Sequence, residues 1–137
     1  MVSDASGLIT KPSQYSARET IERFEAAVKA QGWTVFAELD HAAAAERVGL
    51  VLQARTVIVF GDLTVGTPMM QQAPTLAIDV PAKALVWQDD QGKVWLTYNS
   101  GEYIGNYVYP RHGLTMSTEA LKGLVRFLDE VSDQSTK

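Results

Sequence analysis

The clearest helical pattern lies in residues 16–32, SARETIERFEAAVKAQG. Ser16 and Glu19 have the spacing of a capping box, in which two side chains satisfy the first backbone amides of a helix. The apolar residues recur at helical intervals and form one face: Ile21, Phe24, Ala27 and Val28. Gly32 ends the pattern. An amphipathic helix is therefore predicted here.

Three other segments have the pattern of strands. Residues 33–39, WTVFAEL, alternate with an aromatic residue on each face, so both faces of this strand should be partly covered. Residues 56–60, TVIVF, are β-branched and apolar, and they are predicted to form the middle of the sheet, buried on both sides. Residues 8–10 are a candidate edge strand, because Lys11 and Pro12 tolerate or protect an edge.

Residues 82–88 and 93–99 are predicted to form a β-hairpin. They are joined by DDQG, in which Gly92 can adopt the positive φ of a short turn. A second amphipathic helix follows over residues 117–133, with Ser117 as its expected cap. Its apolar face contains Leu121, Leu124, Val125, Leu128 and Val131.

These elements predict the α+β class. A hairpin followed by a terminal helix favours a mainly antiparallel sheet of about five strands with helices packed on one face, and it does not fit a doubly wound fold. We interpret residues 1–137 as a single domain, with flexible ends at 1–6 and 133–137.

Composition excludes several classes of function. The sequence has no cysteine, so disulfides, thiolate metal sites and cysteine nucleophiles are excluded. The formal charge is -4, the wrong sign for neutralising phosphates, so nucleic acid is not an expected partner. No apolar run is long enough to span a bilayer, so no membrane association is expected. The first residues lack a signal-peptide pattern, and we expect a cytoplasmic protein.

Four segments resemble the family known as domain of unknown function 302. They are FAELDHAAAAERVGL (36–50), TVIVFGDLTVGTPMMQQAP (56–74), AIDVPAKALVWQDDQGKVWLTYN (77–99) and YVYPRHGL (107–114). Each is weak alone, and their shared order and spacing make the resemblance specific. The chain departs from the family at Asp62 and Leu63, where the family usually has Asn-Pro, and at Val80, where it tends to have Leu. The first change places a charge in the loop.

The resemblance implies a single α+β domain with a curved antiparallel sheet and helices on one face, usually seen as a dimer. It implies no established activity. Similar architectures elsewhere handle DNA or lipids, but function depends on sites and not on folds. The acidic composition gives no support to the analogy with DNA-binding folds.

Asp40 and His41 are the first candidate site, and two readings are open. Asp40 is a favoured N-cap, the four alanines that follow His41 form helix readily, and Gly49 is placed to end it. This structural reading does not explain His41. In the first turn the helix dipole disfavours protonation of an imidazole, which leaves a lone pair for catalysis or for a metal.

Residues 60–74 raise a second possibility, phosphate binding. Gly61 and Gly66 have suitable spacing, but Thr67 and Pro68 replace the lysine and hydroxyl residue that should follow, and Asp62 would repel a phosphate. We instead expect Thr67 to be the N-cap and Pro68 the first residue of a short helix ending near residue 74. Met69 and Met70 then either fill the core or line a ligand groove.

The histidines and tyrosines complete the candidates. His41 and Glu46 lack the spacing of a zinc helix, so no metal site is expected unless folding brings His41 and His112 together. Residues 101–110, GEYIGNYVYP, are a candidate dimer contact, with a pocket lid as the alternative.

The sequence therefore favours a small homodimer that binds a small ligand or a protein partner without catalysis. The expected ligand-binding residues are His41, Phe60, Met69, Met70, Tyr98 and His112. The alternative is an enzyme in which His41 is a general base or metal ligand, oriented by Asp40 or Asp79. No cofactor is identified.

Overall fold

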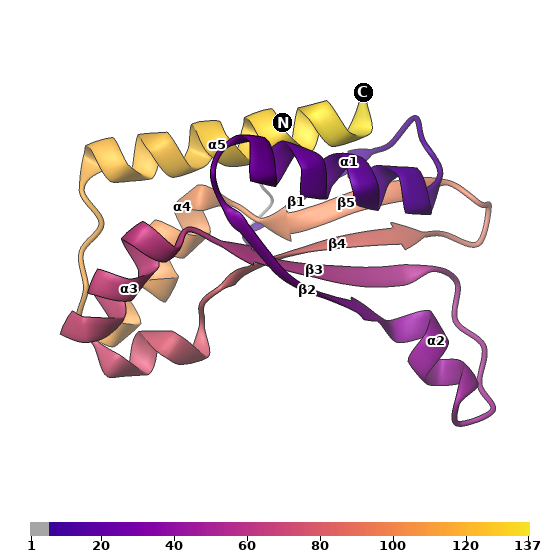
Figure 1. Ribbon diagram of the computed structural model, residues 1–137, viewed down its shortest axis with the longest axis horizontal. Helices are drawn as coiled ribbons and strands as arrows, with labels where there is room; N and C mark the ends of the chain where they lie inside the picture. Colours follow the sequence, from indigo (N-terminus) through magenta and orange to yellow (C-terminus); the bar gives the residue numbers. More distant parts are fainter. Residues whose placement is uncertain (1–5) are drawn as a thin grey trace.

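The computed structural model describes residues 6–137, and the chain forms two layers (Figure 1). The strands are β1 (Leu8–Pro12), β2 (Thr34–Asp40), β3 (Arg55–Gly61), β4 (Ala82–Gln88) and β5 (Val94–Asn99). They form one antiparallel sheet in the order β1-β5-β4-β3-β2. The predicted α+β class and antiparallel sheet are confirmed.

Two long helices, α1 (Ala17–Ala30) and α5 (Thr118–Thr136), cover one face of the sheet (Figure 1). The shorter elements lie at the ends of the sheet: α2 (His41–Glu46), α3 (Leu63–Gln72), η1 (Pro74–Ile78), α4 (Gly101–Tyr103), η2 (Ile104–Val108) and η3 (Pro110–His112). None of the helices in residues 6–137 has the length and hydrophobicity that a bilayer crossing requires.

The strand expected in the middle of the sheet is not there. The middle strand is β4, and β3 lies between β4 and the edge strand β2. In β3, Ile58 and Phe60 are fully buried, whereas Val57 and Val59 are half-buried. The prediction failed because a β-branched apolar run suits any interior strand, and the hairpin β4-β5 determines which strand is central.

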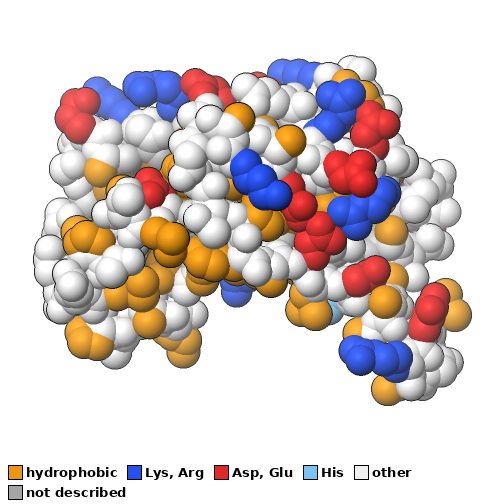
Figure 2. Space-filling model, viewed as in Figure 1, with side chains coloured by type: hydrophobic (Ala, Val, Ile, Leu, Met, Phe, Trp, Pro, Cys, Tyr) orange, Lys and Arg blue, Asp and Glu red, His pale blue; other side chains and the backbone are white. Residues whose placement is uncertain are grey.

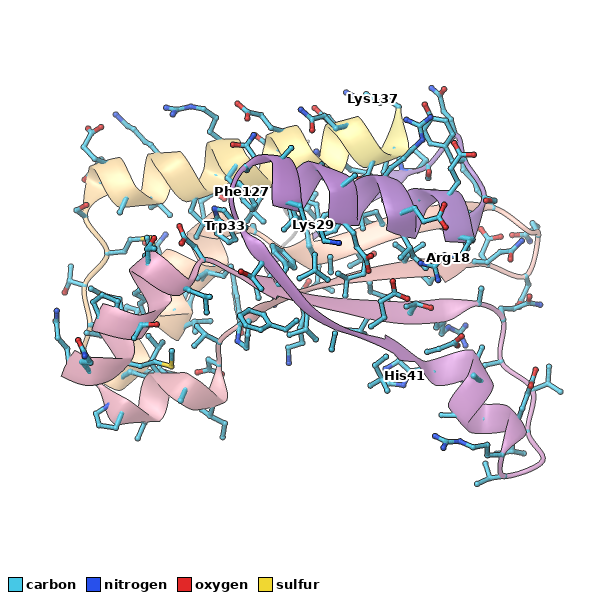
Figure 3. All side chains as sticks on the ribbon, viewed as in Figure 1. Arg18, Lys29, Trp33, His41, Phe127 and Lys137 are labelled. Atoms are coloured by element: carbon cyan, nitrogen blue, oxygen red, sulfur yellow. The ribbon has the colours of Figure 1, made fainter. Side chains whose placement is uncertain are left out.

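The core lies between the sheet and the two long helices. Phe24 of α1 meets Phe60 of β3 edge to face, with 5.1 Å between ring centroids. Trp33, after the Gly32 turn, stacks on Phe127 of α5 at 3.8 Å (Figure 3). Such ring pairs add about 0.5–1.5 kcal/mol beyond the area they bury. They fix the end of α1, the sheet and α5 relative to one another.

The edge strand β1 is held against α5 by a buried lysine. Lys11 is 6% exposed, and its Nζ donates to Ser132 Oγ at 2.6 Å and to Asp133 Oδ1 at 3.0 Å. The C-terminal residues that we expected to be flexible belong to α5 as far as Thr136, and Ser135 is fully buried. Their polar sequence hid this packing, because serine and threonine hydroxyls can bond to the preceding turn. The expected flexible N-terminus falls almost entirely on residues 1–5, outside the described residues.

The helix after β3 begins earlier than predicted. Asp62, and not Thr67, is the N-cap of α3, because its Oδ1 accepts from Thr64 N at 3.1 Å and from Thr64 Oγ1 at 2.7 Å. Pro68 therefore lies inside the helix and not at its start. The chain turns into α3 directly from the end of β3.

The free edge of β2 is irregular. A β-bulge shifts its register against β3 between Val35 and Ala37. Towards its end, Glu38 and Asp40 place carboxylates on the strand. On the side facing α1, Glu38 accepts two bonds from the Arg18 guanidinium, at 3.0 and 3.2 Å.

Candidate functional site

A cavity of about 1040 Å³ opens at the end of the sheet where β3 ends and β4 begins. Its walls come from β3, α3, the loop before β4, the segment 99–117 and one side of α5. Apolar and aromatic side chains dominate these walls, among them Trp33, Phe60, Met69, Met70, Tyr103, Leu124 and Phe127. Volume and lining are typical of a small-molecule site.

Four of the residues singled out from the sequence meet in this cavity. Phe60 forms part of its inner wall, Met69 and Met70 contribute from α3, and Asp79 lies in the turn that leads into β4. The two methionines also pack against a small second core around Leu76. The two methionines therefore pack in a small core and also line the cavity.

Asp40 and His41 lie at the other end of the sheet. Asp40 pairs with Thr56 at the start of β3, whereas the cavity lies beyond Phe60 at its end. Figure 3 shows His41 where β2 passes into α2, and the residue is exposed. The fold does not bring His41 to Asp79 or to His112, and residues 6–137 contain no cluster of three His, Cys, Asp or Glu positioned for a metal.

The expected Asp40 cap is confirmed, because its Oδ1 accepts from Ala43 N at 2.9 Å. Asp40→Ala should therefore lower the free energy of unfolding by about 1 kcal/mol. His41→Ala should change it by less than about 0.5 kcal/mol, because the side chain is exposed and alanine favours helix. Urea denaturation of the two variants measures both values. A larger loss for His41→Ala than for Asp40→Ala would contradict this division.

His112 is not part of the cavity lining, but it contacts Asp79, which is. Its side chain is 5% exposed, its Nδ1 lies 2.8 Å from Thr75 Oγ1, and its Nε2 is hydrogen-bonded to Asp79 Oδ2. Arg111 Nε reaches the same carboxylate at 3.0 Å. The hydrogen bond from His112, helped by the charge of Arg111, lowers the pKa of Asp79. Asp79 is thus held as a carboxylate in the cavity wall.

Both ring nitrogens of His112 are occupied by Thr75 and Asp79. This leaves no free lone pair for a substrate, so the histidine positions Asp79. Sequence reasoning missed Thr75 and Arg111. Thr75 lies 37 residues before His112, and nothing in the local pattern indicates that they meet.

The tyrosines divide between core and cavity. Tyr98, expected to bind ligand, is 3% exposed, and its hydroxyl lies 3.1 Å from Ser132 Oγ beneath α5. It does not line the cavity. Tyr103, Tyr107 and Tyr109 of the segment 101–110 do line it. Their position favours the pocket-lid alternative over the dimer contact for this segment.

Two glycines within helices face the cavity. Gly66 of α3 and Gly123 of α5 line it, and a Cβ added at either position would meet nothing within 4 Å. Neither has a positive φ, so the backbone does not require glycine there. Glycine in a helix costs roughly 0.5–1 kcal/mol relative to alanine. Both helices therefore lose some stability at these positions, and the absence of side chains there leaves more open volume in the cavity.

Fold and cavity together define an α+β protein with a largely apolar cavity at one end of an antiparallel sheet. The family model for the domain of unknown function DUF302 matches residues 9–131, so the chain belongs to that family. The fold is shared with a solved structure, the uncharacterized conserved protein DUF302 from Bacillus stearothermophilus. The TM-score is 0.77 at 17% identity, covering 96% of this chain and 99% of that one.

Curated relatives carry a different name. The fluoride-specific ion channel FluC 1 of Brucella suis biovar 1 is 42% identical over 121 residues, or 88% of this chain. The fluoride-specific ion channel FluC 2 of Brucella melitensis biotype 1 is also 42% identical over 121 residues. The chain spans 46% of the first protein and 43% of the second, less than half of each. The name describes those whole proteins.

Proposed function

We propose that the chain is a binding domain that holds a small apolar ligand in the cavity without transforming it, and that it works as a homodimer. The observation that carries the proposal is the cavity of about 1040 Å³ walled by Phe60, Met69, Met70 and neighbouring aromatic rings. Pockets that are largely apolar with a few polar groups are the usual sites of small ligands. The two helix glycines that keep it open support the same function.

Catalysis is not part of the proposal. His41 is exposed and does not line the cavity, and His112 has both ring nitrogens bound to protein atoms. A general base needs a free lone pair within hydrogen-bond reach of a substrate. The fluoride-channel activity named for the relatives is not proposed either, because this chain corresponds to less than half of each.

The ligand proposal is tested by filling the cavity at Gly123. Gly123→Leu should reduce binding of the uncharged fluorescent probe Nile red at least tenfold, because the new side chain points into the open volume. Gly123→Ala is the matched control. It should stay binding-competent and should raise the free energy of unfolding by about 0.5–1 kcal/mol. Fluorescence titration and urea denaturation give both quantities, and equal probe binding by Gly123→Leu and the parent would contradict the proposal.

The dimer proposal rests on the uncovered face of the sheet. Because Ile58 and Phe60 point towards α1 and α5, the alternate residues of β3 point the other way. This open face contains Leu39, Val57, Val59, Leu85, Trp87 and Trp95. Figure 2 shows the molecule hollowed between two projections, with hydrophobic side chains on both. A second copy of the chain would cover this face at the end towards α2, away from Lys83 at the start of β4.

One of these projections is an arm formed by α2 and the loop to β3 (Figure 1). Its apolar side chains lie in water: Val48 is 72%, Leu50 65%, Val51 92% and Leu52 40% exposed. Contiguous exposed apolar residues mark interaction sites. Two chains with a formal charge of -4 each repel one another, so an apolar contact suits their association.

The dimer is tested by charging the arm. The parent should sediment as a dimer at micromolar concentration, and Val51→Asp should weaken the dimer more than tenfold, because a buried carboxylate in the contact lacks a partner. Its thermal unfolding should be little changed, since Val51 is 92% exposed. Ala26→Asp, on the exposed side of α1, is the control and should stay dimeric. A monomeric parent would rule out the dimer.

A further inference from the structure

We propose that the ligand is a long-chain carboxylate, with its apolar chain in the cavity and its carboxylate at Lys83. This inference rests on the proposed ligand-binding function and names the chemistry of the ligand. It follows from the charges around the cavity. Four charged side chains contribute to the lining: Asp62, Asp79, Lys83 and Arg111.

Three of these four charges are already engaged. Asp79 and Arg111 form an ion pair with 3.0 Å between Arg111 Nε and Asp79 Oδ2. Asp62 caps α3 through its bonds to Thr64, at the helix end where the backbone dipole stabilises an anion. Lys83 forms no ion pair and no side-chain hydrogen bond with any residue in the described range 6–137. Lys83 is therefore the cation in the cavity lining that is available to a ligand.

The position of Lys83 places its charge away from the apolar interior. Its neighbour Ala82 pairs with Phe60, whose ring is fully buried in the inner wall. Lys83 itself pairs with Val59, so its side chain leaves the sheet on the open face and is exposed. The ammonium therefore lies at the rim of the cavity. A head group there keeps part of its hydration, while an attached chain enters the apolar interior.

The single free charge and the apolar wall of the cavity together indicate which kind of anion fits it. One unpaired ammonium balances the single charge of a carboxylate, whereas a phosphate monoester carries nearly two charges. A compact anion would leave the wall formed by Met69, Met70 and Leu124 without contacts. A long alkyl chain fills it and gains roughly 0.8 kcal/mol for each buried methylene group. A flexible methionine-rich wall also adapts to such a chain.

The test is a displacement assay in which the competing ligands share one chain length and differ in their head groups. Nile red is bound to the intact protein. Laurate, dodecyl phosphate and dodecylamine are added below their critical micelle concentrations, and dodecanol is added below its solubility limit. Laurate should displace the probe at about a tenfold lower concentration than dodecanol, because a hydrogen bond between charged groups is worth more than a neutral one. Lys83→Met should remove this difference and leave dodecanol unchanged. Lys122→Met, which removes an exposed lysine of α5 outside the lining, should keep it.

The outcomes separate this inference from the proposed function. Equal displacement by laurate and dodecanol, or a laurate preference that survives in Lys83→Met, overturns the carboxylate assignment. Stronger displacement by dodecyl phosphate or dodecylamine also overturns it. In all these cases, loss of Nile red binding in Gly123→Leu would leave the cavity as a binding site. If Nile red binds the parent and Gly123→Leu alike, the proposed function fails and the carboxylate fails with it.

Discussion

Lys11→Ala is expected to lower the free energy of unfolding by about 3 kcal/mol. The ammonium is buried beneath α5, where it bonds to Ser132 and Asp133 and lies 5.8 Å from the Tyr98 ring. Burial alone would lower the pKa of Lys11, but the bond to Asp133 and the proximity of Tyr98 outweigh it, so the pKa is raised. Alanine removes the buried apolar stem and the donor to Ser132, and it leaves Asp133 with Lys137, at 3.3 Å, as its remaining cation. The lost packing and the lost buried hydrogen bond both lower stability.

Urea denaturation near pH 7 measures this loss. Lys11→Met keeps most of the apolar stem and should cost about half as much, because Ser132 retains its bond to Tyr98. Lys122→Ala controls for the loss of a lysine at an exposed position of α5 and should change stability by less than about 0.5 kcal/mol. A loss below about 1 kcal/mol for Lys11→Ala would show that the buried ammonium is not a main anchor of β1.

Glu25→Gln is expected to stabilise the protein at alkaline pH and not at acid pH. Burial raises the pKa of Glu25 to about 7, and a hydrogen bond to Glu38 contributes. The pKa of Glu38 is lowered, mainly by its bond to Arg18. The two carboxyl groups therefore share one proton near neutral pH. The buried Oε2 of Glu25 has no hydrogen-bond partner, so the charge that appears once the proton is lost is poorly compensated.

The direction in which stability changes with pH follows from proton linkage. Between about pH 4.5 and about pH 7 the folded chain holds a proton on Glu25 that the unfolded chain releases, so stability falls as pH rises through this window. Glutamine keeps a donor for Glu38 at every pH. We expect Glu25→Gln to exceed the parent by about 1–2 kcal/mol near pH 8, after allowance for residual solvent, and to match it near pH 5.

Denaturation at both pH values checks the difference. Glu46→Gln, at an exposed position of α2, should show no such dependence on pH. An advantage of Glu25→Gln that is the same near pH 5 and near pH 8 would show that the effect is not due to titration of this pair.

The parts of the fold that depend on local chemistry could be predicted. Ser16, Asp40 and Ser117 are N-caps as expected, because a cap is a contact between residues close in sequence. The start of α3 was wrong because Asp62 and Thr67 are both competent caps. Which of the two residues becomes the N-cap depends on where β3 ends. The identity of the central strand likewise depends on long-range pairing, which periodicity does not encode.

The candidate site was predictable only in part. The cavity is lined by Phe60, Met69 and Met70, as apolar residues beside a loop often form pocket walls, and Asp79 contributes a charge to the same lining. Tyr98 points to the helical layer because its partner in the hairpin register is the buried Ala84. A shift of the β4-β5 register by one residue would have turned the Tyr98 side chain to the open face of the sheet. Thr75 and Arg111 act through contacts across the fold, so no local motif reveals them.

The bulge in β2 limits how copies of this protein can grow into larger assemblies. A regular free edge would let a second β2 continue the sheet, and repeated addition would lead towards a fibre. Here the register shift between Val35 and Ala37 breaks the row of free amides and carbonyls. Asp40, whose carboxylate caps α2, adds a negative charge at the end of this edge, and a second copy of the strand would bring a like charge to it. Pairing of a second copy at this edge is therefore disfavoured, and the dimer proposed above uses the open face, of which each chain has one.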